Sequence, residues 1–346
     1  MKLNYDISAN TVLNDPEIEN KLQWMKDAGV SAIWLLGYFY GHYEASLEEM
    51  AKAKNILEEK GFEVFVISLP VGHPGNSLDP TNPDLDLKIP DSWTYRVDRF
   101  GNPVYYCGCI DDILIEDNKK AMEEYKKLGF TKVFFDDDLR QGNCYDEIQG
   151  CFCDRCIEKF NKKYNFKVDR NALSEICITD LKQSDDNIYK ANIQKAWIKF
   201  NCDKVTRFMK ETKIDGIQSG IMVMYRGNEK HGISLPDILK AVPDCLVRVG
   251  EWHFDDINYD TTQGRHNLKN SIESHMAAVK NKSNIYSEST VFPANALSPE
   301  NFTDKIKIEL SCGIKNIFLM SGTWFLEKPY WDALKKARQN GDWEID

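Results

Sequence analysis

The sequence predicts an α/β protein with the fold of a (β/α)₈ TIM barrel, formed by residues 1–346 as a single domain. Three features support this prediction: apolar strands alternate with amphipathic helices, a glycine repeatedly follows the end of a helix, and eight strand–helix units can be counted. An open doubly wound sheet is the alternative, but it requires a glycine-rich phosphate turn after its first strand. The segment Asp6-Ile-Ser-Ala-Asn-Thr offers no such turn.

The predicted strands are short, nearly continuous apolar runs, as expected for parallel strands that are buried on both faces. Gly29, Gly61, Gly129 and Gly313 each stand between the end of a helix and such a run. Glycine at this position accepts the left-handed conformation that turns the chain back sharply. The eight predicted strands lie near residues 3–8, 30–37, 62–69, 130–137, 214–223, 245–253, 284–290 and 314–321.

A predicted helix follows each strand. Ser46 and Glu49 have the spacing of a capping box, which marks the start of one helix. Within the helices, apolar residues recur at intervals of three and four, as Ile18, Leu22 and Met25 do, so each helix has one buried face. The predicted helices lie near residues 16–28, 46–60, 113–128, 189–212, 235–241, 265–281, 299–312 and 328–340.

Two long insertions interrupt this repeat. Residues 70–112 follow the third predicted strand and residues 139–188 follow the fourth, on the face where such barrels hold their active sites. Loops of this length inside a compact domain are usually functional or disordered. Neither insertion is of low complexity, so we expect ordered loops.

The composition excludes some classes of partner. The chain is 42% hydrophobic and 28% charged, with a formal net charge of −10. Nucleic acids and anionic membranes require clustered Lys and Arg, so neither is expected as a partner. No segment reaches the roughly 18 apolar residues of a membrane span, and the N-terminus has no apolar signal region, so we expect a cytoplasmic protein. A homo-oligomer stays open.

The ten cysteines include one dense cluster, Cys151-x-Cys153-x₂-Cys156. Thiols of a cytosolic protein stay reduced, so clustered cysteines favour a metal. Tetrahedral zinc requires four ligands, with thiolates at about 2.3 Å. Cys107, or Cys109 as the alternative, would complete a closed and therefore structural zinc site across residues 107–156. A metal-free thiol cluster and redox chemistry are the other interpretations.

Carboxylates stand at the ends of two predicted strands. Asp136, Asp137 and Asp138 end the fourth strand, and alternation sends Asp137 to one face and the other two to the opposite face. A loop cap or a salt bridge to Arg140 is the alternative for any one of them. Glu288 is the only carboxylate in the seventh strand, where it serves either catalysis or a structural partner inside the barrel. Two carboxyl groups from different strands are the usual apparatus of glycoside hydrolysis.

Aromatic and polar side chains cluster near the same strand ends. Sugar rings pack their apolar faces on aromatic side chains, while polar groups bind the hydroxyls. For any single aromatic residue, packing in the core is the alternative. The predicted substrate-binding residues are Tyr38, Tyr40, His42, Asp136, Arg140, Arg226, Glu251, Trp252, His253 and Trp324.

Several motifs occur in a recognisable order over most of the predicted barrel. They are Gly37-Tyr-Phe-Tyr-Gly, Ser68-Leu-Pro-Val-Gly-His-Pro, Asp98-Arg-Phe-Gly before Tyr105-Tyr-Cys107, the cysteine triplet before Phe160, and Glu288-Ser-Thr-Val-Phe-Pro-Ala-Asn. In this order the chain resembles the β-galactosidases of glycoside hydrolase family 42, which are retaining (β/α)₈ glycosidases. The resemblance implies a zinc site at the cysteines and a nucleophile at Glu288.

The resemblance also implies an acid/base residue at Asp138. The family has Asp-Asn-Glu-Tyr where this chain has Asp136-Asp137-Asp138-Leu139, so the acid would be one methylene shorter. The stereochemical course, retention or inversion, therefore stays open, because it depends on the separation of the two carboxyl groups. Specificity for galactose is not carried over.

The sequence thus predicts a glycoside hydrolase-like enzyme without an organic cofactor. Glu288 attacks the anomeric carbon, Asp138 protonates the leaving oxygen, and Asp137 hydrogen-bonds a ring hydroxyl. The first alternative is a metal-dependent sugar isomerase, epimerase or lyase, with a divalent ion held by the Asp triplet, Glu251, His253 and Glu288. The second is a carbohydrate-binding barrel without catalysis.

Overall fold

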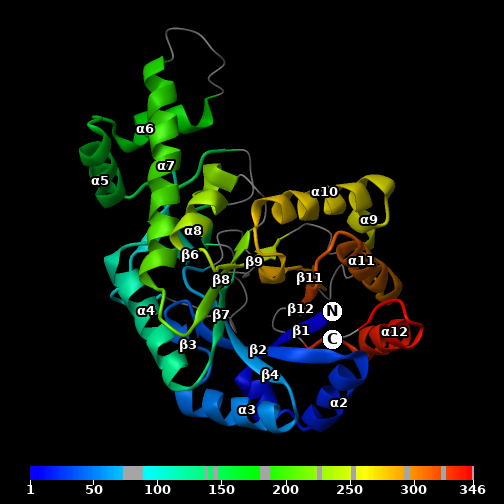
Figure 1. Ribbon diagram of the computed structural model, residues 1–346. Helices are drawn as coiled ribbons and strands as arrows, with labels where there is room; N and C mark the ends of the chain where they lie inside the picture. Colours follow the sequence, from blue (N-terminus) through cyan, green and yellow to red (C-terminus); the bar gives the residue numbers. More distant parts are fainter. Residues whose placement is uncertain are drawn as a thin grey trace.

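The computed structural model describes residues 1–72, 89–136, 139–142, 147–179, 188–223, 228–250, 255–291, 297–320 and 325–344. Eight parallel strand positions form a closed barrel, because the first strand pairs with both the second and the last. Helices surround it (Figure 1), so the (β/α)₈ prediction is confirmed. The barrel strands are β1 (Lys2–Ile7), β2 (Val30–Phe39), β4 (Glu63–Leu69), β7 (Lys132–Phe135), β8 (Gln218–Val223), β9 (Leu246–Val249), β10 (Ile285–Tyr286) with β11 (Ser289–Thr290), and β12 (Asn316–Met320).

The eight predicted helices are present to within a few residues. They are α2 (Ile18–Ala28), α3 (Leu47–Glu59), α4 (Asp112–Lys127), α7 (Ile188–Glu211), α8 (Leu235–Ala241), α10 (Thr262–Ala278), α11 (Pro299–Ser311) and α12 (Lys328–Gln339). Ser46 and Glu49 form the expected capping box at α3. Gly29 ends α2 with φ of 97°, and its N–H donates to the carbonyls of Met25 and Lys26. The local signals in the sequence therefore set these boundaries.

The structure adds short elements that the periodicity did not predict. Three antiparallel pairings occur outside the barrel ladder among the described residues. They are β3 (His42–Tyr43) on β2, the hairpin of β5 (Tyr95–Val97) with β6 (Pro103–Gly108), and a single bridge between Gly72 and Cys107 of β6. The additional helices are α1 (Ala9–Asn14), α5 (Asp154–Tyr164), α6 (Arg170–Ile178) and α9 (Asp256–Tyr259), with short 3₁₀ helices at Asn228–His231 and Lys282–Asn284.

The apolar residues form three separate clusters. The largest lies between the barrel and its surrounding helices. A second fills the inside of the barrel, where Trp34 packs against Phe65, Phe134, Tyr286 and Phe318 with ring centroids 4.8–5.9 Å apart. These aromatic rings fill the barrel interior, so we expect a ligand to bind above them, toward the carboxyl ends of the strands.

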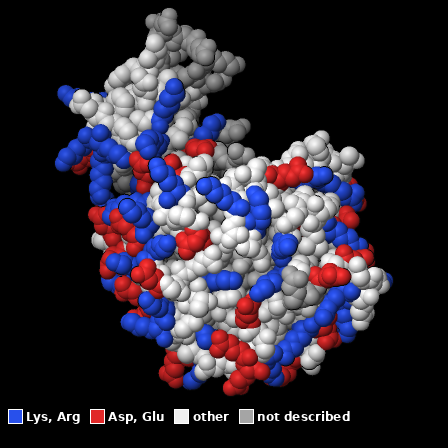
Figure 2. All heavy atoms as spheres, in the orientation of Figure 1, with Lys and Arg blue, Asp and Glu red and all other residues white. Residues whose placement is uncertain are grey.

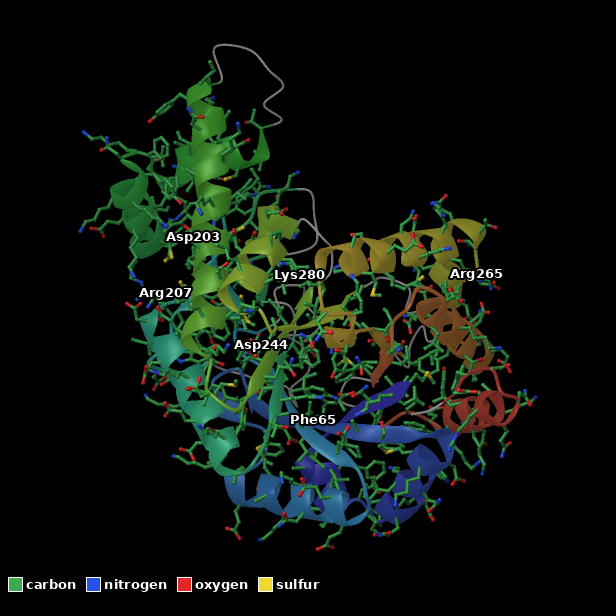
Figure 3. All side chains as sticks on the ribbon, viewed as in Figure 1. Phe65, Asp203, Arg207, Asp244, Arg265 and Lys280 are labelled. Carbon is green, nitrogen blue, oxygen red and sulfur yellow. The ribbon has the colours of Figure 1, made fainter. Side chains whose placement is uncertain are left out.

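The third cluster belongs to a helical projection formed by α5, α6 and the first half of α7, which extends away from the barrel (Figure 1). Trp197 and Phe160 are fully buried in it. Two α7 residues labelled in Figure 3 join this helix to its neighbours: Asp203 pairs with Lys163 of α5 and Arg207 with Asp112 of α4, both at 2.7 Å. The described part of the second insertion is therefore ordered.

Charges of both signs are interspersed over the face of the molecule drawn in Figure 2. This pattern is typical of a solvated surface. In the part of the chain that the structure describes, no helix has the length and apolarity that a bilayer span requires.

Candidate functional site

Two carboxylates from different strands converge on one arginine at the carboxyl end of the barrel. Asp136, directly after β7, and Glu288, between β10 and β11, both form ion pairs with Nη2 of Arg248 in β9. The Glu288 Oε1 to Nη2 distance is 3.6 Å. The three side chains are only 8%, 9% and 2% exposed, respectively. The structure therefore brings two of the predicted acids together around a buried cation.

Alternation along the strands explains this convergence. In β7, β9 and β10 the inward residues Phe134, Leu246 and Tyr286 belong to the apolar cluster inside the barrel. Two positions further along each strand, the inward residue is Asp136, Arg248 or Glu288. A charged layer thus lies directly on the apolar interior.

Arg248 is held from below as well. Its Nη1 lies 2.6 Å from the sulfur of Met320, and its guanidinium group lies 5.3 Å from the centroid of the Phe318 ring. Such a cation–π contact is strongest where water is excluded. Arg248 is absent from the residues predicted above, although it is the only charged residue between Cys245 and Val249.

Asp6, at the end of β1, is a third carboxyl group of this layer. It is 4% exposed, and its Oδ1 has no hydrogen-bond partner among the described residues. Burial, and next the negative charge of Asp136, raise the pKa of Asp6 to about 8, although Arg248 acts in the opposite direction. Asp6 is therefore mostly protonated at neutral pH. Asp6 is also absent from the predicted site residues, although Asn4 and Asp6 alternate with apolar residues in this strand and this alternation could have indicated it.

Of the other residues predicted to bind substrate, Tyr38, Tyr40, His42 and Arg140 belong to the described part of the chain. Tyr38 and Tyr40 are buried in the cluster around the barrel, where the Tyr38 ring packs against Tyr43 and Trp93. His42 is exposed and Arg140 is 3% exposed. Both tyrosines thus pack in the core, and their contact with substrate stays a prediction. The predicted residues outside the described part of the chain are Asp137, Asp138, Arg226, Glu251, Trp252, His253 and Trp324.

Four cysteines form a second polar cluster at the base of the projection. The sulfur atoms of Cys109, Cys151, Cys153 and Cys156 all lie within 4.8 Å of one another, and those of Cys109 and Cys156 are 3.6 Å apart. Four thiolates around tetrahedral zinc would be separated by about 3.8 Å, because each Zn–S bond is about 2.3 Å. Among the described residues, this is the one group of side chains that can hold a metal such as zinc.

The fourth cysteine of this group is not the one that was preferred from the sequence. Cys107 lies outside the cluster and Cys109, the alternative, belongs to it. Cys107 is part of β6, is fully buried, and has its pKa raised to about 11, chiefly by burial. Cys109 follows the end of that strand, where its N–H donates to the carbonyl of Thr94. The position of the strand end therefore decides which thiol reaches the cluster.

The surroundings lower the pKa of three of the four thiols, Cys109, Cys151 and Cys153, whereas hydrogen bonds with these three raise the pKa of Cys156. Nζ of Lys204 lies 3.5 Å from Sγ of Cys156 and 3.9 Å from Sγ of Cys109. Although burial lowers the pKa of Lys204, the thiols raise it above its ordinary value, so the lysine stays charged. Hydrogen bonding with Cys109 is the largest of the effects that lower the pKa of Cys151 to about 6. Thiolates are the form of cysteine that binds metals.

Comparison with known proteins shows the fold but no family. No protein-family model matches the sequence, and no curated protein is significantly similar to it. The catalytic domain of a β-amylase from Paenibacillus polymyxa superposes with a TM-score of 0.61 at 12% identity, over 97% of both chains. A structure from a study of two fungal β-1,4-galactanases superposes with a TM-score of 0.51 at 11% identity. The superposition covers 97% of this chain and 99% of the galactanase chain. A spore cortex-lytic enzyme from Bacillus megaterium superposes with a TM-score of 0.50 at 6% identity. The superposition covers 100% of this chain and 74% of the chain of that enzyme. This chain therefore shares the TIM-barrel fold of glycosidases at low sequence identity.

Proposed function

We propose that this protein is a glycoside hydrolase with its site at the carboxyl end of the barrel. The observation that carries the proposal is the convergence of Asp136 and Glu288 on Arg248. Glycosidases require two carboxyl groups from different parts of the chain, and Asp136 belongs to the same acidic triplet as Asp138, the predicted acid/base residue. The fold that this chain shares with a β-amylase and with fungal galactanases supports the same class of substrate, a carbohydrate.

The proposed roles follow from charge and position. Glu288 is the nucleophile, since the guanidinium of Arg248 at 3.6 Å stabilises its negative charge. Asp138 is the acid/base residue and Asp137 binds a ring hydroxyl, as the sequence predicts. Asp136 points into the barrel, and the alternation of the sequence predicts the same side for Asp138, which lies outside the described residues. A carboxyl group can stay protonated here near neutral pH, because the surroundings raise the pKa of Asp6 to about 8.

The position of Arg248 favours hydrolysis over the metal-dependent isomerase, epimerase or lyase. A divalent ion bound by these acids would take the place between Asp136 and Glu288 that the guanidinium group holds. Displacing a buried arginine from two carboxylates is costly. A carbohydrate-binding barrel without catalysis would have no need of a carboxylate pair ordered by a buried cation.

The test is a panel of aryl glycosides that differ in sugar and in anomeric configuration. Wild type should release phenol from at least one member, and Glu288→Gln and Asp138→Asn should each lower kcat by about 10³-fold or more. Glu273→Gln is the matched control, because Glu273 is exposed on α10 and should leave kcat unchanged. Binding of a sugar without turnover would contradict the proposal, as would activity that is lost with a chelator while the fold persists.

We further propose that the four-cysteine cluster binds one structural zinc ion. The sulfur distances, the nearby Lys204 and the lowered pKa of Cys151 support it. Four protein thiolates leave no open position for a substrate, so the ion would stabilise the projection. Metal analysis should find one zinc per chain in wild type and in Cys107→Ser, but none in Cys109→Ser. Retention of zinc by Cys109→Ser would contradict this assignment.

A further inference from the structure

The strand segment that carries Glu288 is irregular. The seventh barrel strand is split into β10 and β11, with Ser287 and Glu288 between them. The Ser287 N–H still donates to the carbonyl of Asn316 at 2.9 Å, but the N–H of Phe318 donates to the side-chain oxygen of Ser287 at 3.3 Å. A side chain thus replaces a backbone carbonyl in the ladder. The strand alone fixes this segment less firmly than a regular ladder would.

The helix outside the barrel provides the missing contacts. The buried residues of α11 include two charged ones, Lys305 and Glu309, which are 0% and 1% exposed. Nζ of Lys305 donates to the backbone carbonyl of Glu288 at 3.2 Å. The hydroxyl of Ser289 lies 2.9 and 2.8 Å from the two carboxylate oxygens of Glu309. Both residues bind the backbone or the immediate neighbour of the proposed nucleophile.

Burying two charged side chains between α11 and the strand is energetically unfavourable. Burying a lysine or a glutamate costs much more than burying an apolar residue, even when the charge is paired. Spacing of four residues puts both on the same face of α11, toward the strand. Apolar residues at these positions would pack against the barrel but would leave the irregular segment without these hydrogen bonds.

We infer that Lys305 and Glu309 are positioning residues that orient Glu288 toward Arg248 from outside the barrel. Lys305 holds the Glu288 carbonyl, and Glu309 holds Ser289, so the Glu288 side chain between them projects inward. Inside, its Oε1 meets Arg248 at 3.6 Å and the hydroxyl of Thr290 at 3.4 Å. The inference about catalysis rests on the proposed function, whereas the orientation of Glu288 does not.

The test compares Lys305→Met and Glu309→Gln with Ile306→Val, a variant of a buried apolar residue on the same helix. We expect the two polar variants to lower kcat by about 10- to 100-fold with little change in KM, because small misplacement of a reacting group has effects of this size. Ile306→Val should lower the melting temperature without lowering kcat. Lys305→Arg, which keeps a donor, should restore part of the lost kcat.

Crystal structures of the same variants test the orientation without any substrate. The expected result is that Glu288 no longer contacts Arg248. If the contact and kcat are both unchanged, or if kcat is unchanged although Glu288 moves, the inference is wrong. If wild type hydrolyses no glycoside but Glu288 moves in the variants, the proposed function fails and the positioning role stands. If the charged variants do not fold, Ser289→Ala is measured in the same way. This substitution removes only the hydroxyl that donates to the Glu309 carboxylate, so a lower kcat and a displaced Glu288 would support the positioning role of Glu309.

Discussion

The barrel mouth and the helical projection both bury reactive polar groups, but they balance the charge differently. At the mouth, Asp136 and Glu288 share the cation of Arg248, and Asp6 is mostly neutral because its pKa is about 8. The chain supplies its own counter-charge there. In the projection, four thiols have two cations beside them, Lys204 and Arg155, and Arg155 also pairs with Asp111.

The two regions therefore differ in whether their geometry requires a bound ion. The mouth lies on barrel strands, and side chains of α11 hold the irregular segment around Glu288, so its geometry needs no ligand. The projection has a small apolar cluster joined to the barrel through α7, and its thiolates would repel one another without an external cation. We therefore expect the projection to depend on metal and the mouth to depend on Arg248.

The largest expected effect is loss of the metal from the projection. Removing zinc with a strong chelator, or Cys156→Ser, should unfold α5 and α6, because zinc binding contributes on the order of 10 kcal/mol to such sites. Hydrogen exchange should show loss of protection in these helices, while the barrel strands stay protected. Unchanged protection in α5 and α6 would mean that the apolar cluster alone holds the projection together.

A smaller effect is expected when the mouth loses its cation. Arg248→Met leaves Asp136 and Glu288 close together without their shared partner, which should lower the free energy of unfolding by about 3–5 kcal/mol. Urea denaturation measures this loss. Adding Asp136→Asn to Arg248→Met should recover part of it, since one buried charge is removed. No recovery in the double variant would show that Asp136 and Arg248 are not energetically coupled.

Asp6 should make the stability of the mouth depend on pH. Its folded-state pKa of about 8 lies above the value of about 4 expected in the unfolded chain, so between these values the folded state retains a proton that the unfolded state releases. Stability from this group is therefore complete below about pH 4 and is lost as the pH rises through 8. Between about pH 4 and pH 8, the free energy of unfolding of Asp6→Asn should therefore rise relative to that of wild type by on the order of a few kcal/mol. Parallel pH profiles of the two proteins in urea denaturation would contradict the assignment.

The smallest effect is expected at the outer surface of the projection. Asp203→Asn removes the ion pairs with Lys163 at 2.7 Å and Lys199 at 2.9 Å, both partly exposed. Such pairs contribute less than about 1 kcal/mol and are screened by salt. Thermal unfolding at low and high salt should show a small difference from wild type that shrinks as salt is added. A large decrease in the melting temperature would mean that the ion pairs of Asp203 support the cysteine cluster.

Much of the fold and part of the site follow from local sequence. The strand and helix periods, the capping box of Ser46 and the glycine turns gave eight strand–helix units, which the structure confirms. The same patterns selected Asp136, Glu288 and the cysteine triplet, because each stands at a strand end or in a dense motif. The single domain, the cytoplasmic location and the roles of Asp137 and Asp138 stay predictions.

Periodicity over neighbouring residues is enough to predict which segments become strands and helices, so these elements can be read from the sequence alone. Which polar groups meet depends on the closed fold. Closure of the barrel brings Asp6 and Arg248 to the carboxylates, packing of α11 brings Lys305 and Glu309 behind Glu288, and the end of β6 selects Cys109 over Cys107. The physical reason is that local periodicity fixes the direction of each side chain, whereas the partner it meets comes from a distant part of the chain that only the closed fold brings near.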